Sequence, residues 1–171
     1  DYGRHVAAPL AHNNIVIAGS HQVGLQGIRV TKGNEKLRAE VIWKNIEAQP
    51  NISHGVLVNE HYYGLGDPAK LVCVNITSGK TVWSNESLSF PDPKRAMAAF
   101  IVMKNNILSL TSGGELCLFS ASQTEFKELG RTQICGINWC MPAYFDGKIY
   151  VRDGIRKKGG NLICADLTKP H

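Results

Sequence analysis

Five cysteines and six histidines are the side chains best suited to nucleophilic or metal chemistry in this chain of 171 residues. Cys73, Cys117 and Cys164 lie within apolar, β-prone runs, so we expect three small buried thiols. Cys135 and Cys140 flank Gly-Ile-Asn-Trp, a spacing that fits no metal-binding knuckle. The two could meet across a bend, so a disulfide remains open as the less favoured alternative to two free thiols.

Two histidines, His5 and His54, stand just before apolar runs, where imidazoles could ligate a metal or titrate near neutral pH. Neither has a third ligand at matching spacing, so the favoured interpretation is that they cap strand ends. Calcium requires several convergent oxygen ligands, but the acidic residues mostly sit in turns, as Asp146 and Asp67 do. These side chains therefore predict no catalytic residue, no metal ligand and no cofactor ligand.

The element that positions the remaining side chains is a hairpin at residues 71–83. Apolar residues alternate up to Val74, a polar turn follows, and a second β-prone run ends on Trp83. Asn75 can hydrogen-bond to its own backbone two residues on, and Gly79 supplies the positive φ that such a loop needs. Two strands cannot bury an indole ring, so Trp83 must pack against another copy of the unit.

Further copies of this hairpin are present along the chain. Four segments join a turn to an apolar strand, and the second strands begin at Ile28, Leu71, Leu116 and Leu162, with spacings of 43, 45 and 46 residues. Trp43 repeats the closing aromatic position of Trp83. A period in the low forties with several short strands per repeat is typical of β-propeller blades, which have about four strands each.

The predicted fold is all-β, a partial or half propeller of about four blades, each of four antiparallel strands. We expect a single domain over 1–171, with approximate blades at 5–50, 51–92, 93–133 and 134–171. Counting the runs gives about fifteen strands, so the last blade lacks its outer strand. In the third blade Leu129 stands near the expected tryptophan position, which predicts weaker anchoring. The final sheet would expose a whole face, which a longer polypeptide, ring closure or a second copy could cover.

Charge and hydropathy exclude two classes of partner. The net charge is +5, but the basic residues are scattered over turns, and phosphate binding requires a clustered stripe. The sequence has no membrane-length apolar stretch and no signal-peptide pattern at its start. We therefore expect no nucleic-acid partner and no transmembrane segment, with any export signal lying outside this chain.

The segment from Cys73 to Trp83 resembles the blade motif Ala-x-Asp-x-x-Thr-Gly-Lys-x-x-Trp of the quinoprotein, or PQQ-like, β-propeller superfamily. Asn75 stands for the aspartate and Ser78 for the threonine, while Gly79, Lys80 and Trp83 match. Two segments of the fourth repeat, 146–151 and 161–167, also look like that superfamily, in particular the C-terminal half of bacterial exported PQQ-like repeat proteins. The resemblance covers nearly the whole chain but is weak in the first and third repeats.

This resemblance implies that the tryptophan docks on the neighbouring blade, and it implies two kinds of function. Some members hold pyrroloquinoline quinone and calcium at the axis and are dehydrogenases. Others, including a lipoprotein that assists outer-membrane barrel assembly, lack the cofactor and bind proteins. A quinone carrier of this type is expected to have a vicinal cysteine pair, and no two cysteines here are adjacent. The fold alone does not choose between the two.

The resulting expectation is a non-catalytic propeller that acts as a protein-interaction or assembly scaffold, periplasmic or secreted. The alternative is part of a PQQ-dependent oxidoreductase with an incomplete cofactor site. The expected partner is a protein, a second copy or the remaining blades of a larger propeller. Residues near the starts of the first strands, which line the axis of a propeller, are the channel-lining candidates: His5, His54, Arg95 and Trp139.

Overall fold

The computed structural model describes residues 7–66, 68–154 and 159–168, and strands dominate them. The first sheet has β1 (Leu10–His12), β2 (Ile15–Ser20), β3 (Gly24–Lys32) and β4 (Leu37–Asn45). The second has β5 (Val56–Val58), β6 (His61–Gly66), β7 (Lys70–Asn75) and β8 (Thr81–Asn85). The third has β9 (Ala98–Met103), β10 (Asn106–Thr111), β11 (Glu115–Ser120) and β12 (Glu128–Gln133). The fourth has β13 (Ala143–Phe145), β14 (Lys148–Arg152) and β15 (Leu162–Asp166).

Each sheet is an antiparallel meander in which every strand pairs with the next one in sequence. Over the described residues there are fifteen strands, and the fourth sheet has three of them. Pro93–Arg95 form a 3₁₀ turn between the second and third sheets. The all-β prediction and its count of about fifteen strands are therefore confirmed, while the exact blade limits remain a prediction.

The first three sheets share one irregularity in their outer strand. A β-bulge adds one unpaired residue to β4, β8 and β12, namely Ile42, Val82 and Leu129. The residue after the bulge returns to the face that packs toward the next sheet in sequence, which we call the forward face. Trp43 and Trp83 occupy this position, opposite Gly27 and Cys73.

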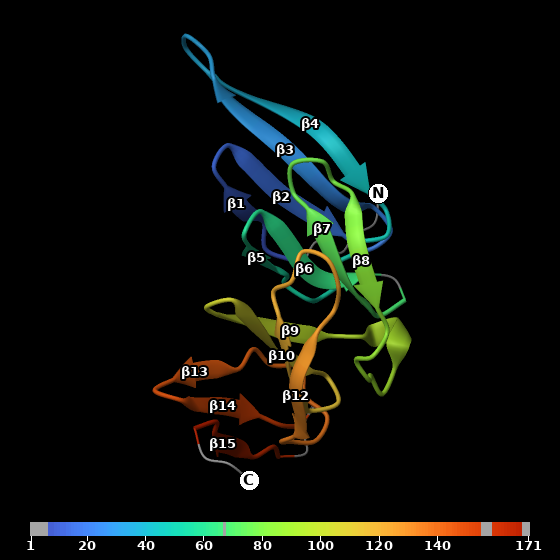
Figure 1. Ribbon diagram of the computed structural model, residues 1–171, viewed down its shortest axis with the longest axis vertical. Helices are drawn as coiled ribbons and strands as arrows, with labels where there is room; N and C mark the ends of the chain where they lie inside the picture. Colours follow the sequence, from blue (N-terminus) through green and yellow to red (C-terminus); the bar gives the residue numbers. More distant parts are fainter. Residues whose placement is uncertain (1–6, 67, 155–158, 169–171) are drawn as a thin grey trace.

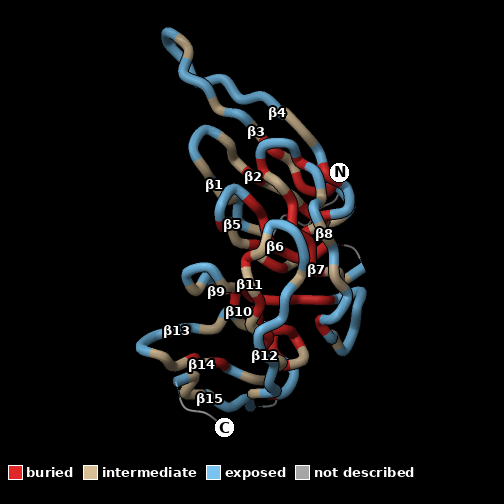
Figure 2. The backbone as a smooth tube through the Cα atoms, viewed as in Figure 1, coloured by how far each residue is buried: buried red, intermediate tan, exposed pale blue. Residues whose placement is uncertain are grey.

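Three apolar cores lie between consecutive sheets. Ile17 and Leu25 meet Tyr62 and Val74 between the first and second sheets. A second core joins the forward face of the second sheet to the third, and a third core joins the third sheet to the fourth. Figure 2 shows the buried residues gathered along these junctions, whereas the tip of β3–β4 and the strand β13 are exposed. Each sheet is thus stabilised mainly by its neighbours in the sequence.

The first strands of the first three sheets lie next to one another. β1 contacts β5, and β5 contacts β9, and the four sheets follow each other along the molecule with the fourth farthest from the first (Figure 1). Neighbouring innermost strands of this kind are typical of blades arranged about a common axis.

The β3–β4 hairpin is the longest of the first sheet, because its ladder pairs as far as Lys32 and Leu37 and projects from the molecule (Figure 1). One detail of the first sheet differs from the sequence-based expectation. By register, Leu25 is the counterpart of Leu71, whereas the sequence comparison started the strand at Ile28. The counterparts Leu25, Leu71, Leu116 and Leu162 are spaced by 46, 45 and 46 residues, a more regular repeat.

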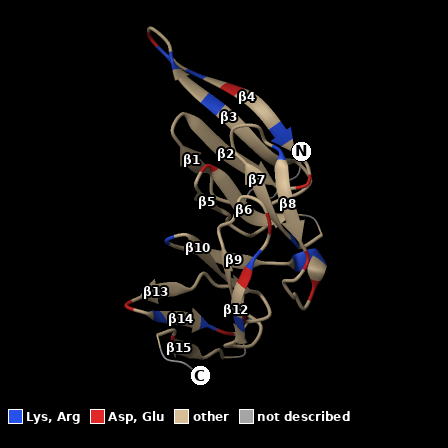
Figure 3. Cartoon of the chain, in the orientation of Figure 1, with Lys and Arg blue, Asp and Glu red and all other residues tan. Residues whose placement is uncertain are grey.

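Basic side chains are spread over several elements. Figure 3 shows lysines and arginines on β3, on β4, on β14 and around the 3₁₀ turn, with acidic residues between them. The described part of the chain therefore shows no continuous basic stripe of the kind that tracks a phosphate backbone.

Candidate functional site

The turn between β7 and β8 contains four of the residues of the sequence-predicted docking motif, Asn75, Ser78, Gly79 and Lys80. The Asn75 carboxamide oxygen accepts hydrogen bonds from Ser78 N at 2.9 Å and Thr77 N at 3.1 Å. Gly79 has φ 73° and donates its N–H to the Asn75 carbonyl at 2.8 Å. Asn75 N–H in turn donates to the Lys80 carbonyl at 3.0 Å. The motif residues therefore build a rigid, closed loop.

Trp43 of the first sheet docks on this loop. Its indole Nε1 donates to the Ile76 carbonyl at 2.8 Å. A Cβ atom added at Gly79 would lie 2.5 Å from Trp43 Cδ2, so the ring covers the glycine directly. Asn45 adds a second link, because its Nδ2 donates to the Gly79 carbonyl at 2.8 Å. Asn45 was missed by sequence reasoning, although the repeated Trp-x-Asn of β4 and β8 was its signal.

Trp83 of the second sheet docks on the third sheet in the same way. Its Nε1 donates to the Ser122 carbonyl at 3.0 Å, and the Tyr63 hydroxyl donates to the same oxygen at 3.1 Å. The Trp83 ring lies 5.9 Å from that of Tyr63 and 6.0 Å from that of Phe126, centroid to centroid. The indole thus joins an aromatic cluster that spans two sheets.

The third junction lacks this anchor. By register, the position of Trp83 belongs to Gly130, because Gly130 pairs with Leu118 immediately after the bulge at Leu129. Leu129 is 48% exposed and is not the counterpart of a tryptophan. The sequence-based placement of Leu129 there was off by one residue, since spacing alone does not reveal a bulge.

The forward face of the fourth sheet is uncovered over the described residues, and by register it carries apolar side chains together with the charged Lys148, Arg152 and Asp166. Its apolar side chains stand at the positions that the second sheet buries against the third: Phe145 for Val58, Tyr150 for Tyr63, Leu162 for Leu71 and Cys164 for Cys73. Phe145 is 73% exposed and Leu162 is 78% exposed. We call these four residues of the fourth sheet the end face.

Three of the predicted channel-lining residues, His54, Arg95 and Trp139, lie in separate segments of the described structure. His54 lies before β5 and its Nδ1 accepts a hydrogen bond from Ala8 N at 2.9 Å. Arg95 ends the 3₁₀ turn, with Nε 3.9 Å from an Asp92 oxygen. Trp139 is 46% exposed in the linker before β13. His5 lies outside the described residues, so a channel-lining role for these side chains remains a prediction.

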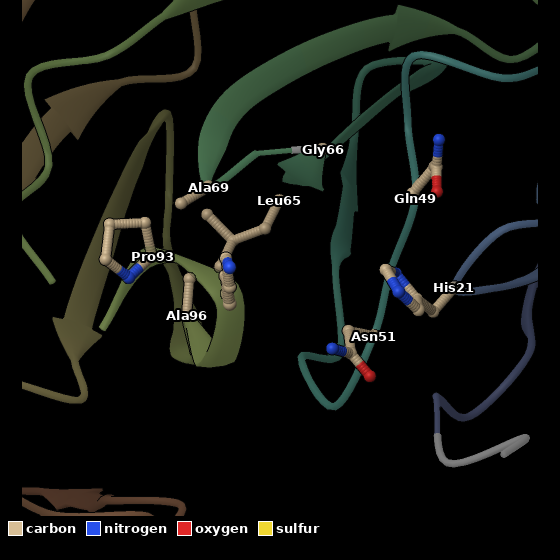
Figure 4. A pocket seen from close by; sticks show the side chains of 9 residues that line it. His21, Gln49, Asn51, Leu65, Gly66, Ala69, Pro93 and Ala96 are labelled. Carbon is tan, nitrogen blue, oxygen red and sulfur yellow. The ribbon is translucent and has the colours of Figure 1, made fainter.

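A small cavity of about 20 Å³ lies where the linkers after the first two sheets meet the 3₁₀ turn. Figure 4 shows Asn51, His21 and Gln49 on one side of it and Leu65, Pro93 and Ala96 on the other. The buried Asn51 carboxamide oxygen has no hydrogen-bond partner among the described residues. The volume suits a single water molecule and no larger ligand.

All five cysteines are free thiols. Cys73 and Cys117 are buried, and burial raises the pKa of each thiol to about 11. The Cys135–Cys140 disulfide, the less favoured alternative above, is not formed. Cys164, predicted to be buried, is exposed, because β15 is the edge of the fourth sheet and no further sheet covers that face in the described structure.

Two carboxylates of the third sheet, those of Glu115 and Glu128, are both paired with Arg131. Glu128 receives a bidentate interaction from Arg131, with Nη2–Oε2 at 2.7 Å and Nε–Oε1 at 3.1 Å. Arg131 also binds Glu115 at 2.9 Å. Among residues 7–66, 68–154 and 159–168, no group of three or more His, Cys, Asp or Glu is arranged to hold a metal ion.

None of the described elements is a helix long and apolar enough to cross a membrane.

Four-stranded antiparallel meanders packed face to face, with their first strands together, define a β-propeller, here a partial one. The structure is similar to that of BamB from Moraxella catarrhalis, with a TM-score of 0.62 and 14% sequence identity over 84% of this chain. It is also similar to the computationally designed Ika8 protein, with a TM-score of 0.51 and 10% identity over 83% of this chain. The aligned region spans 39% of the BamB chain and 53% of the Ika8 chain.

No family model and no curated protein sequence matches this chain. At such low identity the structural similarity establishes the propeller fold and nothing about activity.

Proposed function

We propose that this chain is a non-catalytic β-propeller that acts as a protein-interaction or assembly scaffold outside the cytoplasm, in the periplasm or after secretion. The single observation that carries the proposal is the end face. The second sheet buries the same positions against a following blade, whereas here Phe145 and Leu162 are largely exposed. Burying one such side chain contributes about 1.5–3 kcal/mol, so a docked partner would be strongly stabilised.

The partner we propose for the end face is a further four-stranded blade, supplied by a second copy of the chain. The surface that would meet it is the rear face of the first sheet, where Val16, Ala18 and Ile28 are only half-buried. Each junction inside the chain pairs a forward face with a rear face in this manner. Such a contact is heterologous, and two copies joined by it could close into a ring.

The test is the mass of the native particle, measured by light scattering at micromolar protein. We expect an assembly larger than one chain, reduced to a single chain by the double variant Phe145→Asp/Leu162→Asp. The control is Leu37→Asp, which changes an equally exposed leucine on the projecting hairpin. A wild-type particle with the mass of one chain would overturn the proposed docking.

The resemblance to quinoproteins also implies, as the alternative, a site for the cofactor pyrroloquinoline quinone with a calcium ion. The acidic residues do not fit that group, because they cap turns, as Asp92 does for Lys94 N, or pair with Arg131. We therefore propose that the chain binds no such cofactor. Adding the quinone and calcium together should leave the thermal midpoint unchanged, whereas a saturable rise would favour the oxidoreductase alternative.

A further inference from the structure

A cavity of about 250 Å³ lies between the third and fourth sheets. Its walls are apolar and its mouth lies along β12, where Gly130, Arg131 and Thr132 form the rim. The apolar walls come from four residues of the third sheet and one that follows β15: Met103, Leu108, Leu116, Leu118 and Leu167. This volume exceeds the roughly 150 Å³ of an apolar cavity known to admit benzene, so a larger aromatic ring fits.

The cavity is the space that an indole fills at the two preceding junctions. Leu108 and Leu118 are the register counterparts of Tyr63 and Cys73, the residues beneath Trp83. At the tryptophan position stands Gly130, and a Cβ atom added there would meet no atom within 4 Å. We call this cavity the indole socket, because it has the space for an indole ring whereas residue 130 is a glycine and supplies none.

One wall residue of the cavity, Leu167, stands at the register position of the residue that accepts the indole hydrogen bond at the first junction. Trp43 donates its indole N–H to the Ile76 carbonyl. The counterpart of Ile76 in the fourth sheet is Leu167, because both follow the third strand and donate their backbone N–H to the preceding turn. The two bonds are Ile76 N to the Glu60 carbonyl at 3.1 Å and Leu167 N to the Gly147 carbonyl at 2.8 Å.

We propose that this cavity is a binding site for an indole ring, namely the tryptophan side chain of an extended segment of a partner protein. The mouth favours a polypeptide, because β12 is the edge strand of the third sheet and all its residues, Glu128–Gln133, are exposed. An extended segment that pairs with such an edge places alternate side chains toward the sheet face. One tryptophan among them would enter the cavity beside Gly130.

Methyl NMR of the intact chain tests the site directly. The probes are free indole, N-acetyl-tryptophanamide and the capped peptide Thr-Val-Trp-Ser-Asn, the sequence of β8. We expect saturable shifts of the Leu108, Leu116, Leu118 and Leu167 methyl groups, with the peptide binding at least tenfold more tightly than indole. The peptide with alanine in place of tryptophan should not bind. Equal affinity for indole and peptide would overturn the assignment of a protein segment, and absence of shifts would overturn the site.

Filling the socket from within the chain gives the complementary test. Gly130→Trp should raise the thermal midpoint and weaken peptide binding at least tenfold. The matched control is Leu129→Trp, which adds the same ring at the exposed bulge position and should leave peptide affinity within twofold of wild type. Gly130→Met, whose flexible side chain fills part of the cavity, should lower the affinity for the peptide by a smaller factor. This variant replaces Gly130→Trp in the test if the tryptophan variant does not fold. Undiminished peptide binding by a folded Gly130 variant would refute the proposal.

This site is separable from the scaffold function proposed above. The end face lies on the other side of the fourth sheet from the third core. Gly130→Trp should therefore leave the particle mass unchanged, so a failure of either proposal is seen without the other.

Discussion

Substituting Gly79 by alanine should destabilise the protein through two separable causes. The first is backbone strain, because Gly79 has φ 73° and a side chain there occupies the left-handed region. The second is a collision, because the new methyl group would lie 2.5 Å from Trp43 Cδ2. Relieving that collision requires moving the indole, which would weaken its 2.8 Å hydrogen bond to the Ile76 carbonyl.

Backbone strain destabilises the Gly79→Ala variant in every background, whereas the collision destabilises it only where the Trp43 ring is present. Strain at a non-glycine residue with positive φ lowers the free energy of unfolding by about 1–3 kcal/mol. Alanine also reduces the conformational entropy of the unfolded chain, which offsets about 0.4–1 kcal/mol of that loss. Overpacking against a fixed ring adds about 1–3 kcal/mol. We therefore expect Gly79→Ala to lower the free energy of unfolding by about 2–4 kcal/mol in the wild type, but by only about 1 kcal/mol in a Trp43→Ala background.

Urea unfolding followed by far-UV circular dichroism measures all four corners of this double-mutant cycle, with unchanged slopes as the criterion for comparison. Gly130→Ala is the matched control and should change the free energy of unfolding by less than about 0.5 kcal/mol, because its added Cβ meets nothing within 4 Å. The reasoning would be refuted if Gly79→Ala had the same effect with and without the Trp43 indole.

Three further results are expected. Tyr62→Phe should raise the free energy of unfolding by about 1 kcal/mol in urea titration, because the buried Tyr62 hydroxyl has no hydrogen-bond partner among the described residues; a loss would show that the hydroxyl is satisfied. With a thiol reagent at pH 8, Cys164 should react first. Cys73 should be protected in the native state, because burial raises its pKa to about 11 and leaves roughly one thiolate per thousand. Glu128→Gln should destabilise the protein by less than about 1 kcal/mol at neutral pH, because Arg131 hydrogen-bonds to the carboxylate and lowers its pKa. That contribution is present above the unfolded-state pKa and is lost as the pH falls through the folded-state value, so the two thermal midpoints should converge in acid.

The docking motif could be predicted from sequence because its chemistry is local. Asn75 and Gly79 define their turn within a few residues, and the apolar runs on either side define the strands. A bulky ring such as Trp83, left uncovered by its own hairpin, requires a neighbouring sheet. The period then follows from the repetition of that unit along the chain.

The remaining features depend on register and on distant neighbours. A bulge shifts the side-chain alternation by one residue without a clear sequence mark, which is why the sequence placed Leu129 near the tryptophan position but did not identify Gly130 as its counterpart. The exposure of Cys164 depends on whether a further sheet covers the fourth one, not on the apolar residues beside it. The acceptor for Trp83, the Ser122 carbonyl, lies 39 residues away and is a backbone group that any residue type could supply.

Gly130, at the third junction, also affects which junction between the sheets opens first on unfolding. Trp43 and Trp83 anchor the first two junctions, whereas the equivalent position of the third junction is Gly130, and there the described contacts are aliphatic side chains, Cys135, Cys140 and hydrogen bonds such as that of Asn138 N to the Ser112 carbonyl. On heating, the junction between the third and fourth sheets should therefore open before the two junctions that a tryptophan anchors.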